Sequence, residues 1–261
     1  MKIRTGTLRE LKQQGKKFAC LTSYDQQTAE IFDQAGIELL LVGDSASNTV
    51  LANDTTIPVT LEEMIPFGKA VAKSANSALV VFDMPFGSYE EGSDQALRNA
   101  VRVLKETGVA AVKIEGARVE QIKKLVENGI PVMGHVGFTP QTVHGLSGYK
   151  VQGRADDAER VLQEALAIEA AGAFAIVLEM VPVELAEQIT KKLQIPTIGI
   201  GAGSSTDAQI LVWTDFAGLG EKIPSFARQY LALRDELTSA AKRYAHDVRG
   251  GKFPSQSESF S

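Results

Sequence analysis

The sequence predicts a single (β/α)8 barrel spanning residues 1–261, and three observations carry that prediction. The 261 residues, 44% of them hydrophobic, suit one α/β barrel better than two small domains. Short apolar runs alternate along the chain with segments of helical spacing. No G-x-G-x-x-G follows the first run, whereas a Gly-rich loop, GIGAG at 199–203, follows the seventh. We therefore favour a barrel over an open doubly wound sheet.

Seven apolar runs are predicted to be parallel strands. They are 18–22, 38–42, 78–82, 110–114, 131–135, 174–178 and 196–200. Short strands that are apolar on both faces and separated by helices are typical of βα crossovers in a parallel sheet. An eighth strand is expected near 208–214 or just after it. Helices are expected at 25–36, 93–107, 119–128, 157–171 and 182–193.

Composition excludes several classes of protein. The net charge is −5 and no basic block occurs, so nucleic acid is not an expected partner. Cys20 is the one cysteine, which rules out an intrachain disulfide. The first residues lack the apolar core of a secretory signal, and no apolar stretch could span a bilayer. We expect a cytoplasmic protein without a membrane partner, with a loosely ordered Gly/Ser/Pro-rich tail from about residue 250.

Polar side chains follow most of the predicted strands at their carboxyl ends. Those of interest are Ser23, Tyr24, Asp25, Asp44, Ser45, Asp83, Lys113, Glu115, His135 and Glu179. In a barrel these strand ends meet on one face, where active sites are built. Residues spread over about 150 positions of sequence are therefore expected to form one cluster.

Three carboxylates in this cluster, those of Asp44, Asp83 and Glu115, come from neighbouring strands. Converging carboxylates repel one another unless a cation binds or some are protonated. Oxygen ligands favour Mg²⁺ or another hard divalent ion, and the chain has no set of Cys or His residues suited to zinc. Lys113 lies two residues before Glu115, hence on the same strand face, and offers positive charge to a substrate carboxylate.

Glu179 ends the sixth predicted strand, where a partly desolvated carboxylate can act as a general base. A metal would polarise a substrate carbonyl and stabilise the enolate formed when that base removes an α-proton.

Each of these residues also has a structural interpretation. Asp44 is as suited to capping a helix as to binding a metal. Asp83 could order a turn, His135 could be a hydrogen-bonded core residue, and Lys113 and Glu115 could be a structural pair. Their coincidence on one rim favours metal-assisted chemistry on a small anionic carbonyl compound, and spacing alone leads no further.

A set of longer motifs resembles the ketopantoate hydroxymethyltransferase family. They are LTSYD (21–25), LLVGDS (40–45), TTIPVTLEEM (55–64), FDMPFGSY (82–89), VKIEG (112–116), GIPVMGHVGFTPQ (129–141), GYKVQGR (148–154), LEMVP (178–182) and IPTIGIGAG (195–203). They occur in family order and cover most of the chain from residue 5 to about 235. The GHVGFTPQ and GYKVQGR stretches are the most specific.

The resemblance implies a (β/α)8 barrel that transfers a hydroxymethyl group from 5,10-methylenetetrahydrofolate to 3-methyl-2-oxobutanoate, forming 2-dehydropantoate for pantothenate biosynthesis. It implies that Asp44, Asp83 and Glu115 belong to a Mg²⁺ site. It also implies that Ser45, Asp83 and Lys113 contact the keto acid, that Glu179 accepts the proton, and that His135 lies in the active site. The family commonly assembles as a homodecamer.

Departures from the family pattern lie late in the chain. Asp207-Ala208-Gln209 replaces D-G-Q, Thr214-Asp215 replaces His-Asp, and Pro224-Ser225-Phe226 replaces Pro-Lys-Phe. Two other readings are weighed against the family. An enzyme of the phosphoenolpyruvate mutase and isocitrate lyase group is one, although its lyases use a cysteine and Cys20 lies inside the first strand. A catalytically inactive barrel kept as a scaffold is the other, and the intact acid set disfavours it.

Overall fold

The structure is a computed structural model of the chain that describes residues 2–146, 148, 150–155 and 157–260. Tyr149, within the GYKVQGR motif, lies outside the described residues. Two compact units are distinguished, Met1–Val212 and Trp213–Ser261, and each is described by itself. That the whole chain forms one domain stays a prediction.

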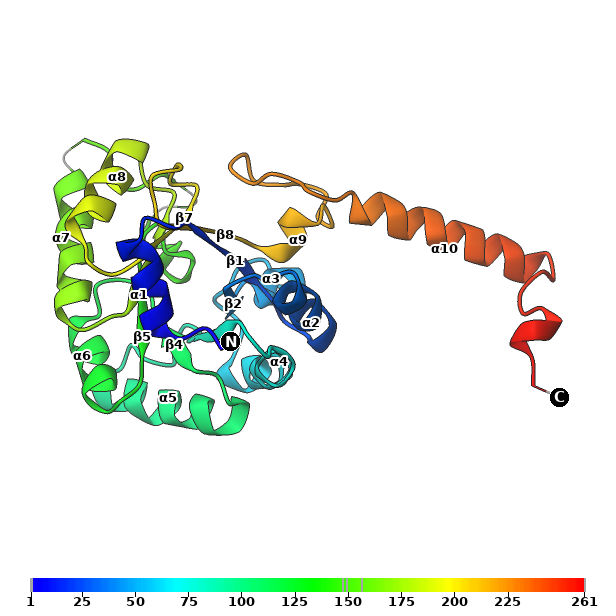
Figure 1. The fold of residues 1–261 in the computed structure, drawn as a ribbon, viewed down its shortest axis with the longest axis horizontal. Coiled ribbons are helices and arrows are strands. Elements are labelled where there is room, and N and C mark those ends of the chain that lie inside the picture. Colours follow the sequence, from blue (N-terminus) through cyan, green and yellow to red (C-terminus); the bar gives the residue numbers. More distant parts are fainter. Residues whose placement is uncertain (1, 147, 149, 156, 261) are drawn as a thin grey trace. The chain divides into compact units, whose positions relative to one another are not determined.

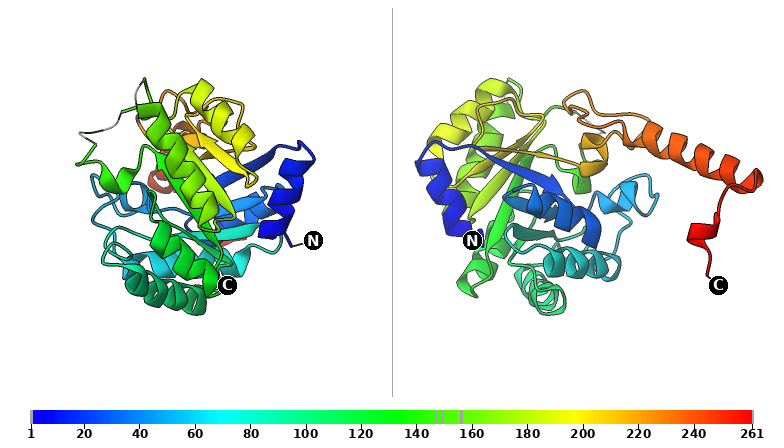
Figure 2. Two further views of the ribbon diagram at one scale, coloured as in Figure 1. Left: turned by 90° about the vertical axis from the view of Figure 1, so that its left-hand side faces the viewer. Right: turned by 45° about the vertical axis from the view of Figure 1, so that its right-hand side comes forward.

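The first unit is a closed barrel of eight parallel strands in sequence order, seen in two further views in Figure 2. The strands are β1 (Phe18–Thr22), β2 (Leu39–Val42), β3 (Leu79–Asp83), β4 (Ala111–Lys113), β5 (Val132–Gly137), β6 (Ala175–Glu179), β7 (Thr197–Ile200) and β8 (Ala208–Leu211). β8 pairs with both β7 and β1, which closes the sheet. The predicted fold class is confirmed, and the eighth strand lies at the earlier of its expected positions.

Helices surround the barrel (Figure 1). They are α1 (Thr5–Gln13), α2 (Gln26–Gln34), α3 (Ala46–Thr49), α4 (Leu61–Ser74), α5 (Ser93–Thr107), α6 (Val119–Glu127), α7 (Asp157–Ala170) and α8 (Val183–Lys192), with a 3-10 turn at Pro140–Thr142. The five predicted helices are confirmed. The prediction missed α1, α3 and α4, although Thr60 and Glu63 form a reciprocal capping box at the start of α4. Gly68 in α4 lets the helix pack closely, because a Cβ there would lie 2.7 Å from the Phe82 ring.

The barrel interior is filled by alternate residues of the strands, as the two-residue repeat of a strand requires. The buried cluster includes Phe18, Cys20, Leu39, Leu41, Leu79, Val81, Ala111, Met133, Ala175, Val177, Ile198, Ile200, Ala208 and Ile210. Leu8 of α1 joins this cluster and is fully buried. α1 therefore supplies an apolar side chain to the barrel core from outside the sheet.

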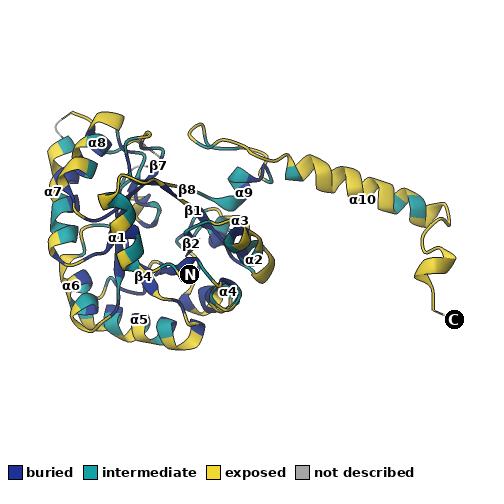
Figure 3. Cartoon of the chain, in the orientation of Figure 1, coloured by how far each residue is buried: buried dark blue, intermediate teal, exposed yellow. Residues whose placement is uncertain are grey.

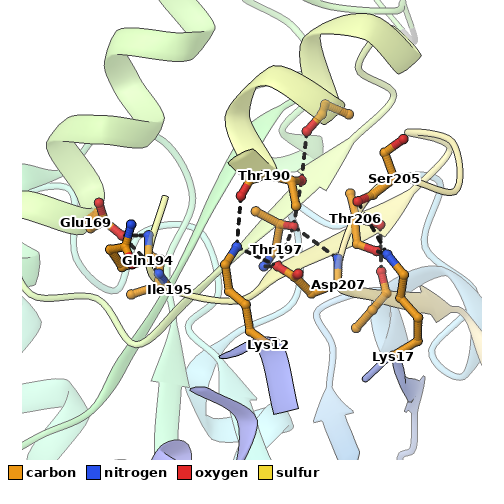
Figure 4. Close-up of polar contacts among 12 residues, drawn as sticks. Lys12, Lys17, Glu169, Thr190, Gln194, Ile195, Thr197, Ser205, Thr206 and Asp207 are labelled. Atoms are coloured by element: carbon orange, nitrogen blue, oxygen red, sulfur yellow. Dashed lines mark hydrogen bonds and ion pairs between the residues drawn. The ribbon is translucent and has the colours of Figure 1, made fainter. Parts of the chain in front are cut away.

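A polar lock ties α1 to the amino ends of the last two strands (Figure 4). The Lys12 ammonium lies 2.8 Å from Asp207 Oδ2 and donates to the Thr190 carbonyl at 2.9 Å. The same carboxylate accepts from the Thr197 backbone N–H at 2.8 Å and from its hydroxyl at 3.0 Å. Lys17 lies beside it and donates to three successive carbonyls at 204–206. These contacts lie at the amino ends of the strands, opposite the end where barrels build active sites, so we assign Asp207 to stability of the fold.

Ala208, one of the departures from the family pattern, lies beside this lock. It is the first residue of β8, and its methyl group joins the barrel core. Since it starts the strand, it lies at the end of the barrel away from the polar rim. The departure therefore changes packing at the amino end of β8 and leaves the strand carboxyl ends untouched.

The second unit contains α9 (Trp213–Phe216), α10 (Leu233–Arg249) and a 3-10 turn at Gln256–Glu258. Its connecting segment returns to α9, since the Tyr230 N–H donates to the Phe216 carbonyl at 2.8 Å and the two rings stack. No residue of α10 is buried (Figure 3). Loose ordering of the tail stays a prediction. Among the described residues, no helix is both long and apolar enough to cross a membrane.

The lock predicts a stability defect in Asp207→Ala. The change leaves the Lys12 ammonium, which is 13% exposed, without its anion and removes the one carboxylate oxygen that accepts two hydrogen bonds from Thr197. The free energy of unfolding should fall by up to about 3 kcal/mol, the lower end of the cost of removing one partner of a buried ion pair, because this pair is partly buried. Asp94→Ala is the matched control, because it removes an exposed pair with Lys124 whose loss should cost less than about 1 kcal/mol. Equal effects of the two changes in urea titrations would contradict the assigned role.

Candidate functional site

Four polar side chains continue the inward-facing rows of the barrel core. Asp83, Lys113, His135 and Glu179 each follow, by two residues along the same strand, a member of the buried cluster: Val81, Ala111, Met133 and Val177. Residues two apart in a strand share a face, so all four face inward at the carboxyl ends. The barrel register places Asp83 opposite Lys113.

Asp44 and Ser45 reach the same region from the turn after β2. The inward position of that strand is taken by Gly43, where a Cβ would lie 2.8 Å from Ser45 Oγ. A side chain at this position would push Ser45 away, so glycine leaves room for the turn. Asp44 is buried, and its backbone N–H donates to Asp83 Oδ2 at 3.3 Å. The neighbouring Ser45 hydroxyl hydrogen-bonds the buried Tyr24 hydroxyl at 2.7 Å.

The Lys113 ammonium joins the acids. It lies 2.7 Å from Asp83 Oδ1 and 3.5 Å from Glu115 Oε1, and all three side chains are almost fully buried. His135 continues the series, with Nδ1 3.4 Å from Glu115 Oε1 and Nε2 3.4 Å from Glu179 Oε2. The structure thus brings the predicted site residues together, with Ser45 next to Asp44 in the turn, in a connected row that ends at Glu179.

Charge within this row is unbalanced. Burial, followed by the charges of Asp83 and Glu115, raises the pKa of Asp44 well above its ordinary value. Burial also raises the pKa of Asp83, even though Lys113 opposes the effect. For Lys113 burial acts to lower the pKa, but the surrounding acids outweigh it and the pKa is raised. The ammonium therefore stays charged, and Asp44 has the strongest need of a further positive charge.

His135 is held between two acids. Burial and the charge of Lys113 act to lower its pKa, but interactions with Glu115 and Glu179 raise it to about 9. Burial raises the pKa of Glu115 and the charges of Lys113 and His135 lower it, with a net lowering. Glu115 is thus kept ionised by protein groups. Its Oε2 also accepts from the Gln141 backbone N–H at 3.0 Å.

Within the described part of the chain, no three His, Cys, Asp or Glu side chains are arranged as a metal-ligand group. The predicted set of Asp44, Asp83 and Glu115 therefore stays a prediction. Glu115 is contacted by three protein donors, from Lys113, His135 and Gln141, whereas Asp83 is contacted by two and the Asp44 carboxylate by one. Asp44 and Asp83 are the better candidates for direct ligands, and Mg²⁺ commonly binds through one or two carboxylates together with water and substrate.

The structure distinguishes the acids that cap helices from those that do not. Ser45, not Asp44, is the residue before α3, and it makes no side-chain capping bond. The Asp44 carboxylate instead accepts from Gln141 Nε2 at 3.0 Å. Asp25 does cap a helix, accepting from the Thr28 N–H at 2.9 Å. The rim therefore contains both kinds of acid, and only packing distinguishes them.

Two residues of the site were not predicted from the sequence. Tyr89 and Gln141 are buried, and the Tyr89 hydroxyl donates to Gln141 Oε1 at 2.5 Å. Both lie on loops beyond the strand ends, where the pattern of strands gives no signal. They do end two of the quoted motifs, FDMPFGSY and GHVGFTPQ.

Comparison with known proteins identifies the relatives of the chain. A family model described as ketopantoate hydroxymethyltransferase matches residues 2–256. A 3-methyl-2-oxobutanoate hydroxymethyltransferase of Leifsonia xyli is 55% identical over 99% of this chain and 95% of its own length. One of Mycolicibacterium vanbaalenii is 54% identical over 100% of this chain and 94% of its own length.

Solved structures share the fold at much lower sequence identity. A phosphonopyruvate hydrolase, in complex with oxalate and Mg²⁺, has a TM-score of 0.63 at 14% identity and covers 98% of this chain and 93% of its own. A 2,3-dimethylmalate lyase of the phosphoenolpyruvate mutase and isocitrate lyase superfamily has a TM-score of 0.62 at 18% identity, covering 100% and 93%. At these identities the likeness concerns the fold alone.

The shared ammonium predicts that Lys113→Met is costly. The change leaves Asp83 and Glu115 buried beside Asp44 with no lysine charge among them. The free energy of unfolding should fall by about 3–5 kcal/mol, the usual cost of removing one partner of a buried ion pair. Lys124→Met makes the same chemical change at an exposed pair with Asp94, and should cost less than about 1 kcal/mol. Similar melting temperatures for the two variants would show that the Lys113 charge is not needed to compensate the buried acids.

Proposed function

Because the chain belongs to the ketopantoate hydroxymethyltransferase family, we propose that it transfers a hydroxymethyl group from 5,10-methylenetetrahydrofolate to 3-methyl-2-oxobutanoate. The product is 2-dehydropantoate, a precursor of pantothenate. The observation that carries the proposal is the connected row of acids, Lys113 and His135 that ends at Glu179 on the barrel rim. The cytoplasmic location stays a prediction.

Asp44 and Asp83 are the residues that would hold Mg²⁺. Both are buried oxygen donors, and burial and neighbouring acids raise the pKa of Asp44, so a divalent cation would favour its ionised form. When bound, Mg²⁺ supplies Lewis-acid polarisation of the substrate carbonyl. Unchanged Mn²⁺ affinity after joint replacement of both aspartates by alanine would exclude this assignment.

Lys113 and Ser45 are proposed to bind and orient the keto acid. The ammonium is already held by Asp83 and Glu115, so its position is set before the substrate arrives. The Ser45 hydroxyl is positioned by Tyr24. A fixed charge and a fixed hydroxyl can bind a carboxylate with little loss of side-chain freedom, which favours a reactive orientation.

Glu179 is proposed to take the proton from C3 of 3-methyl-2-oxobutanoate. Its side chain is 16% exposed, so it lies within reach of a ligand, and Oε2 is 3.4 Å from His135 Nε2. As the proton moves to the carboxylate, the C–H electron pair forms the enolate. The enolate carbon then forms a bond to the methylene carbon of the folate as one of its C–N bonds breaks. Water displaces the second folate nitrogen and supplies the hydroxyl oxygen, and the C3 proton and one proton of the water complete the two N–H bonds of the released tetrahydrofolate. His135, whose Nε2 lies 3.4 Å from Glu179 Oε2, is the neighbour proposed to keep that carboxylate in place.

Turnover of 3-methyl-2-oxobutanoate, measured with and without the folate co-substrate, tests the proposal. Folate-dependent formation of 2-dehydropantoate is the expected result. Cleavage of a 2-hydroxy or phosphono acid instead would favour the lyase and mutase group, whose fold the chain shares. No reaction with any of these compounds would favour an inactive scaffold.

Glu179→Gln isolates the proton transfer. Exchange of the C3 hydrogen for deuterium in D₂O, followed by NMR without folate, should slow by about 10²- to 10⁴-fold, since that is the usual contribution of a general base. Binding of the keto acid should change little, because the amide keeps the shape of the carboxylate. Glu184→Gln in the first turn of α8 is the matched control. Exchange at the normal rate in Glu179→Gln would rule out this base.

We also propose that the chain forms a homo-oligomer, for which the resemblance suggests a decamer. Leu237, Tyr244 and Val248 are exposed on α10, and their spacing of seven and four residues places them on one helix face. Such an apolar stripe normally packs against another element, and a second copy of this chain is the proposed partner. Sedimentation should give a mass of several chains, reduced by Leu237→Glu with Tyr244→Glu. A monomer of the unaltered protein would contradict the proposal.

A further inference from the structure

Gln141 makes hydrogen bonds to two of the three acids at once. It lies in the 3-10 turn Pro140–Thr142, beyond the end of β5, and is buried. Its side-chain Nε2 donates to Asp44 Oδ2 at 3.0 Å, and its backbone N–H donates to Glu115 Oε2 at 3.0 Å. One residue therefore connects the turn after β2 with the segment after β4.

The orientation of the Gln141 amide is determined by its neighbours. Tyr89 OH accepts from the Glu115 backbone N–H at 3.2 Å and donates to Gln141 Oε1. The amide oxygen is thereby assigned, since a phenol donates one hydrogen and an amide nitrogen cannot accept it. Both hydrogens of Nε2 are then directed to acceptors, Asp44 Oδ2 and the Met84 carbonyl, each at 3.0 Å.

We propose that Gln141, oriented by Tyr89, is the positioning residue that presents Asp44 to the divalent cation. The inference rests on the proposed function, which places that cation on Asp44 and Asp83. Gln141 fixes the Asp44 carboxylate through Oδ2, so the other oxygen, Oδ1, would be the one offered to a cation. Its backbone N–H also fixes Glu115 beside Lys113 and His135.

The choice of an amide has a physical reason. A lysine or arginine at position 141 would place a positive charge beside Asp44 and compete with the cation. A glutamate would repel Asp44 and could not donate two hydrogen bonds when ionised. An uncharged donor with an assigned orientation fixes the carboxylate and leaves its charge available. Outer hydrogen-bond partners of metal ligands commonly contribute 10- to 100-fold to metal affinity.

The test is direct binding of Mn²⁺ to the whole protein, followed by the electron paramagnetic resonance signal of free Mn²⁺ without substrate. Gln141→Met, which keeps the length of the side chain but donates no hydrogen bond, should bind Mn²⁺ about 10- to 100-fold more weakly than the unaltered protein. Gln121→Met is the matched control, because Gln121 Nε2 donates to the backbone carbonyl of Tyr89 at 3.3 Å and not to the acids. It should keep the original Mn²⁺ affinity.

Tyr89→Phe is a second variant, whose result does not depend on how well Gln141→Met folds. It removes the hydroxyl that donates to the Gln141 amide oxygen, so a smaller loss of Mn²⁺ affinity is expected, together with a higher Mg²⁺ concentration for half-maximal turnover. If Gln141 and Tyr89 only stabilised the fold, their replacement would lower the melting temperature and change neither the Mn²⁺ affinity nor the Mg²⁺ concentration for half-maximal turnover. Unchanged Mn²⁺ affinity in folded Gln141→Met, or in Tyr89→Phe should Gln141→Met not fold, overturns the inference. Lack of Mn²⁺ binding by the unaltered protein would instead count against the proposed metal site itself.

Discussion

The rest of the site depends on the buried ion pairs that the Lys113 ammonium forms with Asp83 and Glu115. The ammonium lies between Asp83 and Glu115 at the carboxyl ends of the strands, with Asp44 bonded to the far oxygen of Asp83. Burying acids is costly unless positive charge or hydrogen bonds compensate them. Lys113, together with His135 between Glu115 and Glu179, compensates part of the acidic charge, and the remainder is what gives the site its affinity for a cation. The same imbalance explains why the acids are useful for chemistry and why they need a rigid support.

That support comes from the barrel, whose two ends have different tasks. At the amino ends of the strands, Lys12, Asp207 and Thr197 form a closed set of ion pair and hydrogen bonds. At the carboxyl ends, the polar groups point inward and leave charge to be satisfied by a ligand. The lock joins the amino ends of β7 and β8 in the same closed sheet whose β3 to β6 present the polar groups at their carboxyl ends. The Asp-Ala-Gln departure from the family pattern falls at the locked end, which is consistent with an intact reaction site.

Within the site, hydrogen bonds between loops set positions that the strands alone leave open. Strand geometry brings Asp83, Lys113, His135 and Glu179 to one face, but Asp44 lies in a turn and could face several ways. Gln141 and Tyr89 restrict it by linking the segments after β2, β3, β4 and β5. Such links are expected where a metal ligand must be held within a narrow range of orientations.

The sequence by itself determined the order and type of the elements in the barrel and which polar residues end its strands. Apolar runs and helical spacing are local properties, so seven strands and five helices could be predicted, and the closed fold followed from their alternation. Even α4, with its capping box, could have been found locally, although its internal Pro66 obscured it.

Only the tertiary structure decided which acids share a site and which cap helices. Asp25 and Asp44 both follow a strand and precede a helix, yet one caps its helix and the other bonds Gln141, 97 residues away. The roles of Asp207 and Gln141 likewise depend on partners distant in sequence. Hydrogen bonds and ion pairs act over a few ångströms, and a chain brings such partners together only by folding. No local sequence pattern therefore predicts their pairing.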